Sequence, residues 1–147
     1  MSKETKEFAS RIVDAMYQED AYSQWLGIKR IEEDEGYCIL EMTIREEMTN
    51  GFKIAHGGIT FSFADSAFAF ASNSRGRKAV SIETSISHTK PLKIGDIITA
   101  IAEEQSLTNK IGIYNVKILN QNQELVALFK GTVYRTNKEW FEENRGK

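Results

Sequence analysis

The sequence predicts a single α+β domain in which a long helix lies on one face of a curled antiparallel sheet. The 147-residue chain has the length of one domain with a substantial core. A nearly all-apolar stretch from Gly57 to Ser74 predicts one long, buried helix. The other apolar runs alternate like strands, two before this helix and three or four after it. Helix and strands that are segregated in this way favour the α+β class.

The segment before the long helix predicts one helix and two strands. In residues 3–19, one face of an amphipathic helix is formed by Phe8, Ile12, Ala15 and Met16. "AYSQWLG" is interpreted as a short connector that carries a tryptophan to pack. "IKRIEEDEGYCILEMTIREEM" predicts a strand, a turn at "EDEG" and a second strand. Alternation in the second strand places two sets of residues on opposite faces, Tyr37, Ile39, Glu41 and Thr43 on one and Cys38, Leu40, Met42 and Ile44 on the other.

The segment after the long helix predicts antiparallel strands joined by turns. Residues 79–89 are expected to form a strand with one face made of Val80, Ile82, Thr84 and Ile86. "GDIITAIAEEQSL" and "KIGIYNVKILN" follow, and the tight polar turn "NQNQ" leads into "ELVALFKGTVYRT". Pro91, the one proline, falls between two strands, where its missing N–H costs no ladder hydrogen bond. The tail "NKEWFEENRGK" is expected to be a short helix or frayed.

Charge and cysteine content argue against several protein classes. A net charge of -2 and a pI near 5.8 provide no basic face for nucleic acid, and interspersed charges make no membrane-surface patch. The start "MSKETKEFAS" lacks the apolar run of a signal peptide, and polar residues within 57–74 argue against a membrane span. Cys38, the one cysteine, is interpreted as a buried structural thiol, and the lack of a disulfide partner agrees with a reducing cytoplasm.

The long helix carries apolar bulk on two opposite sides, with Phe61 and Phe68 on one and Phe63 and Phe70 on the other. A helix that is apolar all round is buried all round. Because a small sheet covers only one side, we expect the other side to meet a second subunit. Close approach there would be allowed by Ala64, Ala67, Ala69 and Ala71. An isologous homodimer is the simplest arrangement.

Asp65 is the one formal charge in this helix, and no basic residue lies three or four positions away. An unpaired buried carboxylate is costly and usually shifts its pKa, so a catalytic role and a partner on another element both remain open. Gly57 and Gly58 are expected at the opening turn, where backbone N–H groups lack helical partners. Glycine there would let a substrate carbonyl approach the backbone, with a plain tight turn as the alternative.

The spacing of Gly57 and Asp65 decides how they could cooperate. They are eight residues apart, which is ~12 Å along one helix at a rise of ~1.5 Å per residue. One carbonyl carbon cannot lie within ~3 Å of both. A shared site therefore requires Asp65 of one subunit to face Gly57 of a partner.

The stretch "NGFKIAHGGITFSFADSAFAFASNSRG" closely resembles the signature of the PaaI-type hotdog-fold thioesterases of phenylacetic acid degradation. The likeness continues through "LGIKRIEEDEGYCILEMTI", "SISHTKPLKIGD" and "ALFKGTVYR", roughly residues 20–136. It implies one hotdog domain over residues 1–147, paired into homodimers and often homotetramers. It also implies cytoplasmic hydrolysis of acyl-CoA thioesters, favouring aryl-acetyl-CoA, without a metal or organic cofactor.

The resemblance assigns roles residue by residue. Asp65 matches the catalytic acid, which acts as general base on water or as nucleophile. Gly57 matches the residue whose N–H polarises the thioester carbonyl. His56 and Asn50 match residues that orient this turn and contact the substrate, and Ser81 aligns with a serine that helps to place the water in some relatives.

Substrate binding and acyl preference are less directly indicated. Gly58 and Lys90 are grouped with Ser81 as substrate-binding residues. The phosphates of coenzyme A need positive charge, and the candidates, with solvated surface charge as the alternative, are Lys90, Arg75, Arg77 and Lys78. Phe63 stands where the family usually has Leu, and "FKIA" replaces a polar loop, so the acyl group remains open.

Other chemistries find less support. His88 is interpreted as structural, and two histidines with one cysteine, without metal-ligand spacing, argue against zinc or iron. A serine triad lacks its G-x-S-x-G turn. Two alternatives stay open, a hotdog hydratase or dehydratase and a non-catalytic acyl-CoA-binding or regulatory domain. The absence of a second acid near His56 argues against a hydratase or dehydratase. The pairing of Asp65 with Gly57 argues against a non-catalytic domain.

Overall fold

The computed structural model describes residues 2–141 of the chain. Its strands form one six-stranded antiparallel sheet in the order β1-β2-β4-β5-β6-β3. A 3₁₀ turn, Glu46–Met48, lies between β2 and α3. The elements are α1 (Lys3–Gln18), α2 (Ala21–Leu26), β1 (Lys29–Asp34), β2 (Tyr37–Thr43), α3 (Gly57–Asn73), β3 (Arg77–His88), β4 (Ile97–Leu107), β5 (Ile111–Leu119) and β6 (Leu125–Glu139).

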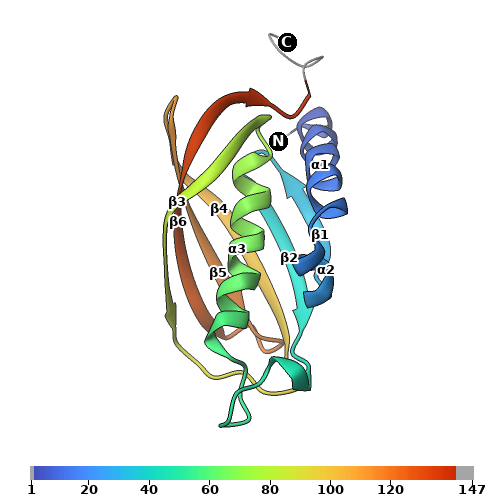
Figure 1. Cartoon of the computed structure of the whole chain (residues 1–147), viewed down its shortest axis with the longest axis vertical. Helices are drawn as coiled ribbons and strands as arrows, with labels where there is room; N and C mark the ends of the chain where they lie inside the picture. The colour runs from blue at the N-terminus through green and yellow to red at the C-terminus, as the bar shows by residue number, and fades with distance from the viewer. Residues whose placement is uncertain (1, 142–147) are drawn as a thin grey trace.

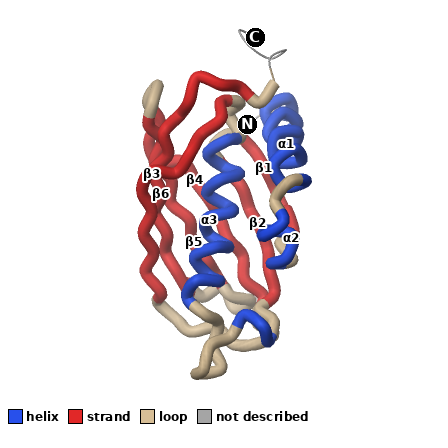
Figure 2. The backbone as a smooth tube through the Cα atoms, in the orientation of Figure 1, coloured by secondary structure: helices blue, strands red, loops and turns tan. Residues whose placement is uncertain are grey.

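The sheet curls around α3, which lies along its concave face, while α1 packs on β1 beside α3 and α2 contacts both α1 and α3 (Figure 1, Figure 2). A curled antiparallel sheet wrapped around one central helix is the hotdog fold, so the expected fold class is confirmed, N-terminal helix included. The strands fall where alternation predicts them, and Pro91 lies between β3 and β4. No helix of residues 2–141 is long and apolar enough to span a membrane.

Alternation in β2 determines which side chains enter the core. Cys38, Leu40 and Met42 are buried, whereas Tyr37 and Ile39 on the other face are half-buried. The Cys38 thiol lies 3.6 Å from the carbonyl oxygen of Ala67, and burial raises its pKa. Cys38 is therefore a buried thiol, as the apolar run predicts.

The expectation that the side of α3 not covered by the sheet meets a second subunit is wrong in part. Tyr17 of α1 packs edge-on against Phe70, with ring centroids 6.4 Å apart, so the chain itself covers that side. On the other side, Phe61 and Phe68 pack against Phe129 of β6. Only a narrow stripe is left open, formed by Gly57, Gly58, Phe61, Ser62, Asp65 and Ala69. The alanines expected to face a partner, Ala64, Ala67 and Ala71, are buried within the subunit.

The interpretation of "AYSQWLG" as a connector is wrong, because its first six residues form the helix α2. Asp20 caps this helix by accepting a hydrogen bond from the backbone N–H of Ser23 at 3.0 Å. Gly27 ends it in the left-handed conformation, at φ 75°. Both signals are readable in the sequence, but the segment is too short to show helical periodicity.

The predicted face of β3 is also wrong in part. A bulge between Ser81 and Glu83 inserts one residue and shifts the alternation. Ala79 and Ile86 therefore pack against the core, while Val80 and Ile82 remain 53% and 57% exposed. These two apolar side chains lie on an edge strand of the sheet.

The C-terminal segment differs from the expected short or frayed helix. Strand β6 continues through residues 137–139. Trp140 then donates its backbone N–H to Gly76 and its indole N–H to Asn73, at 2.8 and 3.0 Å. The rest of the predicted tail, residues 142–147, lies outside the described residues.

Earlier in the chain, the "NQNQ" turn is confirmed, with Gln123 at φ 63°.

Candidate active site

The first turn of α3 presents one backbone donor without a partner. His56 is the N-cap of the helix, and its Nδ1 accepts a hydrogen bond from the Gly58 N–H at 3.0 Å. Nδ1 therefore carries no proton, and the Gly58 N–H is already used. Among residues 2–141, no hydrogen bond to the N–H of Gly57 is found. The exposed Gly57 N–H, at the positive end of the helix dipole, is thus the donor that a ligand can reach.

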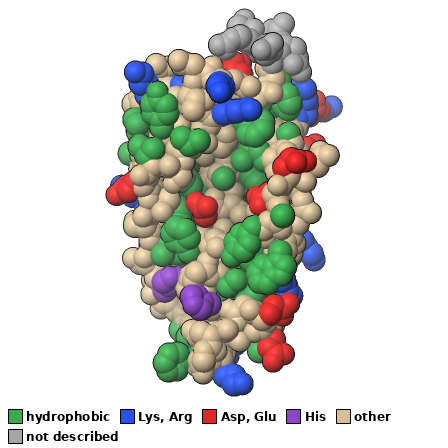
Figure 3. All heavy atoms as spheres, viewed as in Figure 1, with side chains coloured by type: hydrophobic (Ala, Val, Ile, Leu, Met, Phe, Trp, Pro, Cys, Tyr) green, Lys and Arg blue, Asp and Glu red, His purple; other side chains and the backbone are tan. Residues whose placement is uncertain are grey.

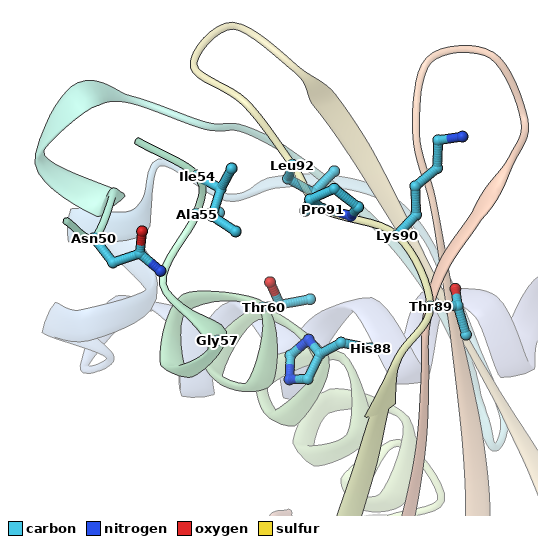
Figure 4. Close-up of a pocket in the computed structure, with 10 residues that line it drawn as sticks. All are labelled: Asn50, Ile54, Ala55, Gly57, Thr60, His88, Thr89, Lys90, Pro91 and Leu92. Carbon is cyan, nitrogen blue, oxygen red and sulfur yellow. The ribbon is translucent and has the colours of Figure 1, made fainter. Parts of the chain in front are cut away.

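A pocket of about 340 Å³ opens in front of Gly57 (Figure 4). Its walls come from the loop before α3, the first turn of α3, and the segment after β3. In sequence order, the lining residues are Asn50, Ile54, Ala55, Gly57, Thr60, His88, Thr89, Lys90, Pro91 and Leu92. The fold therefore brings together three predicted site residues, Asn50, Gly57 and Lys90.

Asn50 has one amide end engaged and one free for a ligand. Its Oδ1 accepts the backbone N–H of Phe52 at 2.9 Å, which stabilises the tight loop before α3. The side-chain nitrogen points toward the segment that leads into Gly57 (Figure 4). Phe52 itself is 84% exposed at the loop tip. Asn50 can therefore both hold the loop and donate a hydrogen bond into the pocket.

His88 also lies in this pocket, and the sequence did not indicate it as a site residue. A Cβ on Gly57 would lie 3.4 Å from His88 Nε2, so the imidazole faces the opening turn of α3 (Figure 4). The available signal was that His88 immediately precedes the Thr-Lys-Pro turn after β3. Only the fold shows that this turn returns to Gly57.

The other predicted binding residues are less centrally placed. The Lys90 side chain points away from Gly57 and pairs with Glu124, Nζ to Oε2 3.1 Å (Figure 4). Ser81 is exposed on β3 and does not line the pocket. Arg75 pairs with Glu104 at 2.7 Å, and Arg77 bonds to the loop at Asn109. These two arginines therefore have structural partners near the far end of α3.

Asp65 lies half-buried in the open stripe of α3. Among residues 2–141, no hydrogen bond or ion pair to its carboxylate is found. Burial raises the pKa of Asp65 above its ordinary value, and the nearby negative charge of Asp20 raises it further. A carboxylate with a raised pKa and no partner is a stronger base than an exposed aspartate, and its oxygens are available to water or substrate.

Helix α2 forms one wall beside Asp65. The Tyr22 hydroxyl donates to Ser62 Oγ at 3.1 Å, and Ser62 donates to the carbonyl oxygen of Gly58 at 2.7 Å. The Tyr22 ring stacks on Trp25, with centroids 6.0 Å apart. Figure 3 shows this face, where hydrophobic side chains gather along α3 and α2. The wall that α2 forms beside Asp65 is therefore made of the aromatic rings of Tyr22 and Trp25.

Asp65 and Gly57 lie on one uninterrupted helix, so they are ~12 Å apart along its axis. A base and an N–H donor at this distance cannot act on the same carbonyl group within one chain. Residues 2–141 contain no group of three or more His, Cys, Asp or Glu side chains that could hold a metal ion.

Comparison with known proteins adds to this geometry. The model of the thioesterase superfamily matches residues 52–127. The acyl-coenzyme A thioesterase PaaI of Escherichia coli is 43% identical over 82% of this chain and 86% of its own length. Human acyl-coenzyme A thioesterase 13 is 32% identical over 86% of this chain and 93% of its own. The solved structure of the E. coli PaaI protein superposes with a TM-score of 0.90, covering 92% and 98% of the two chains at 39% identity.

Proposed function

The chain belongs to the thioesterase superfamily and is an acyl-CoA thioesterase, and on that premise we propose that its active site is built from two subunits. Asp65 of one subunit acts at a thioester carbonyl that the Gly57 N–H of the partner polarises. The observation that carries this proposal is the placement of two unpartnered groups on one helix, too far apart to serve one carbonyl.

The proposed reaction uses few parts. Asp65 takes a proton from water, whose oxygen attacks the carbonyl carbon, and the oxyanion accepts a hydrogen bond from Gly57. Collapse breaks the C–S bond, and the leaving thiolate takes the proton from Asp65, which yields free acid and CoA. The same placement allows Asp65 to attack directly as nucleophile, with water then hydrolysing the acyl-enzyme. In both routes Asp65 must be ionised and the Gly57 donor must be free.

The pocket in front of Gly57 supports the roles proposed for its neighbours. His56 fixes the first turn by accepting from Gly58, which leaves Gly57 for the substrate. Asn50 contacts the acyl-CoA through its free amide nitrogen. Ser81 and Lys90 remain candidates for placing the water and for meeting the CoA phosphates. In this arrangement Gly58 shapes the turn that the substrate contacts.

A homodimer would also cover apolar surface that this subunit leaves open. Strand β3 is a twelve-residue edge strand that exposes Val80 and Ile82. A long edge with unpaired backbone groups and apolar side chains is a ready template for pairing with another chain. Pairing of two β3 strands is the contact we propose for the homodimer, and a homotetramer would join two such dimers through a second surface.

Aryl-acetyl-CoA thioesters are the substrates we propose. The solved E. coli PaaI protein comes from a phenylacetic acid degradation operon. In this chain, the stacked rings of Tyr22 and Trp25 are about half exposed beside the open stripe, at 50% and 48%. Aromatic side chains of this kind favour an aromatic acyl group over a short alkyl chain.

The test is the release of free CoA from a panel of aryl- and alkyl-acyl-CoAs, by wild type and Asp65→Asn. Wild type should turn over phenylacetyl-CoA with a higher kcat/KM than acetyl-CoA. Asp65→Asn should lose about 10²- to 10⁴-fold in kcat on every thioester, because it removes the base without changing size. Near-normal turnover by this variant would show that the mechanism is wrong.

Thermal unfolding provides the fold control for Asp65→Asn. Because burial raises the pKa of Asp65 in the folded state, the ionised carboxylate destabilises wild type at neutral pH. The variant should therefore melt at a higher temperature than wild type at pH 7. This difference should shrink as the pH falls and Asp65 becomes protonated. A variant that melts lower at pH 7 would instead indicate a structural role for the carboxylate.

A further inference from the structure

A buried chain of hydroxyl groups joins α2 to α3 immediately beside Asp65. Asp20, the N-cap of α2, accepts the Ser23 hydroxyl at 2.6 Å. The Ser23 Oγ lies 2.7 Å from the Oγ of Ser66, the residue that follows Asp65. Ser23 and Ser66 are 1% and 8% exposed, so the hydrogen bond between them is shielded from water, while Asp20 itself is half-buried. Neither serine nor Asp20 has a part in the mechanism described so far.

The direction of these hydrogen bonds follows from the number of protons. Ser23 has one hydroxyl hydrogen, and it donates this to the Asp20 carboxylate, which can only accept. The hydrogen between the serines must therefore come from Ser66. The chain runs from Ser66 through Ser23 to Asp20, and its donors all point toward an ionised carboxylate. The Asp20 carboxylate is thus held in one place next to α3.

The charge on Asp20 is not neutralised locally. Asp20 accepts from the backbone N–H and the hydroxyl of Ser23, and no Lys, Arg or His forms an ion pair with it among residues 2–141. A fixed, uncompensated carboxylate next to a second, half-buried carboxylate raises the free energy of the doubly ionised state. The raised pKa of Asp65, due first to burial and then to Asp20, agrees with this geometry.

We propose that Asp20 is a positioning residue of the active site, whose fixed negative charge favours a proton on Asp65 and so makes Asp65 a stronger base. This inference rests on the proposed function of Asp65. Asp20 touches neither the substrate nor the water. It acts through the electrostatic field at Asp65, and Ser23 and Ser66 hold it in place.

Other charged groups on the elements around α3 are directed elsewhere. On α1 and β1, Arg30 pairs with Asp14 and Glu33, and at the end of α3 Arg75 pairs with Glu104 and Glu35. Strand alternation turns a further set toward the opposite face of the sheet, namely Glu41, Glu103, Lys117 and Lys130. On β3, Glu83 pairs with Lys130. His56 and His88 lie near the first turn of α3, and Arg45 pairs with Glu47 and donates to the carbonyls of Trp25 and Leu26 at the end of α2.

The test compares the pH profile of kcat/KM for wild type and Asp20→Asn, using phenylacetyl-CoA. Asn is as good an N-cap as Asp, so α2 should remain formed while the charge is lost. The acidic limb of the profile should move to lower pH, because Asp65 then loses its proton more easily. The midpoint of the Asp65 side-chain ¹³C titration, followed by NMR, should move in the same direction.

Two variants separate charge from structure. Glu19→Gln removes the same charge from an exposed position one residue away, and its profile should superimpose on that of wild type. Ser23→Ala breaks the hydroxyl chain but keeps the Asp20 charge, so it should lower the melting temperature and shift the acidic limb less than Asp20→Asn does.

The outcomes are distinguishable from a failure of the proposed function. An unchanged acidic limb and an unchanged NMR midpoint in Asp20→Asn would overturn the role of Asp20. Equal shifts in Ser23→Ala and Asp20→Asn would also overturn it, because a purely structural role predicts them. If Asp65→Asn retained turnover, the catalytic proposal would fail, and the NMR titration would still decide whether Asp20 acts on Asp65.

Discussion

His56 determines which backbone donor at the start of α3 is free. By accepting the Gly58 N–H at Nδ1, it closes the first turn and leaves the Gly57 N–H pointing out of the helix. A side chain at position 57 is not excluded by crowding, since its Cβ would lie 3.4 Å from His88. The need for glycine there therefore concerns the approach of a substrate more than the stability of the helix.

Replacing Gly57 with proline tests the donor directly. Proline lacks the N–H and is favoured at the first helical position, and His56 already has the extended φ -60°, ψ 136° that a residue before proline requires. Gly57→Pro should therefore fold and lose about 10²- to 10³-fold in kcat for acyl-CoA hydrolysis. The measurement is steady-state CoA release, together with the melting temperature.

Gly57→Ala is the matched control for this experiment, because it adds a Cβ but keeps the N–H. It should retain clearly more activity than the proline variant. Equal activity of the two variants would mean that steric access at position 57, and not its N–H, limits the reaction.

At the scale of the elements, α3 is held by a close contact between an aromatic ring and a strand. Phe68 lies against β6 at Gly131, where a Cβ would come within 2.5 Å of the ring. The same ring packs edge-on with Tyr114 and is tilted against Phe129. This contact sets the distance between the central helix and the sheet, and with it the depth at which Asp65 sits in the open stripe.

Gly131→Ala should destabilise the protein by about 1–3 kcal/mol, because the buried ring or the strand must move. Urea unfolding followed by circular dichroism measures this loss. Gly51→Ala is the control, since no atom lies within 4 Å of its added Cβ, and it should leave the free energy of unfolding unchanged. Equal stability of the two variants would show that α3 shifts away from β6 at no cost.

For the whole molecule, the proposed site exists only where two chains meet. In a symmetric dimer, an Asp65→Asn chain paired with a Gly57→Pro chain has one intact site and one site with both defects. After statistical subunit exchange, the mixture should regain about a quarter of wild-type activity, since about half of the dimers are mixed and each has one site. Activity is measured as CoA release, and subunit exchange is monitored by mass spectrometry of mass-tagged subunits.

The control mixture combines Asp65→Asn chains with chains that carry both substitutions. No intact site can form there, so activity should stay at the level of the separate variants. If exchange is shown to occur and the first mixture also remains inactive, Asp65 and Gly57 do not act across the subunit interface.

Several features of the site follow from the sequence alone because their causes are local. The glycine pair after His56 predicted the start of α3 at Gly57, and alternation predicted the buried face of β2. The absence of a basic residue near Asp65 on its helix predicted a carboxylate without a helical partner. Within residues 2–141, the structure shows no hydrogen-bond or ion-pair partner for the Asp65 carboxylate from any other element either.

Other features arose only from tertiary structure. The bulge after Ser81 depends on how β3 pairs with β6, and it reversed the face that alternation predicted. The placement of His88 at Gly57, and the link from Asp20 through Ser23 to Ser66 on α3, depend on which distant segments the fold makes neighbours. Capping and periodicity act over a few residues and are written in the chain, so the sequence determined the helices, the strands and the candidate acid. The electrostatic field at that acid is a sum over spatial neighbours, and only the folded arrangement decided it.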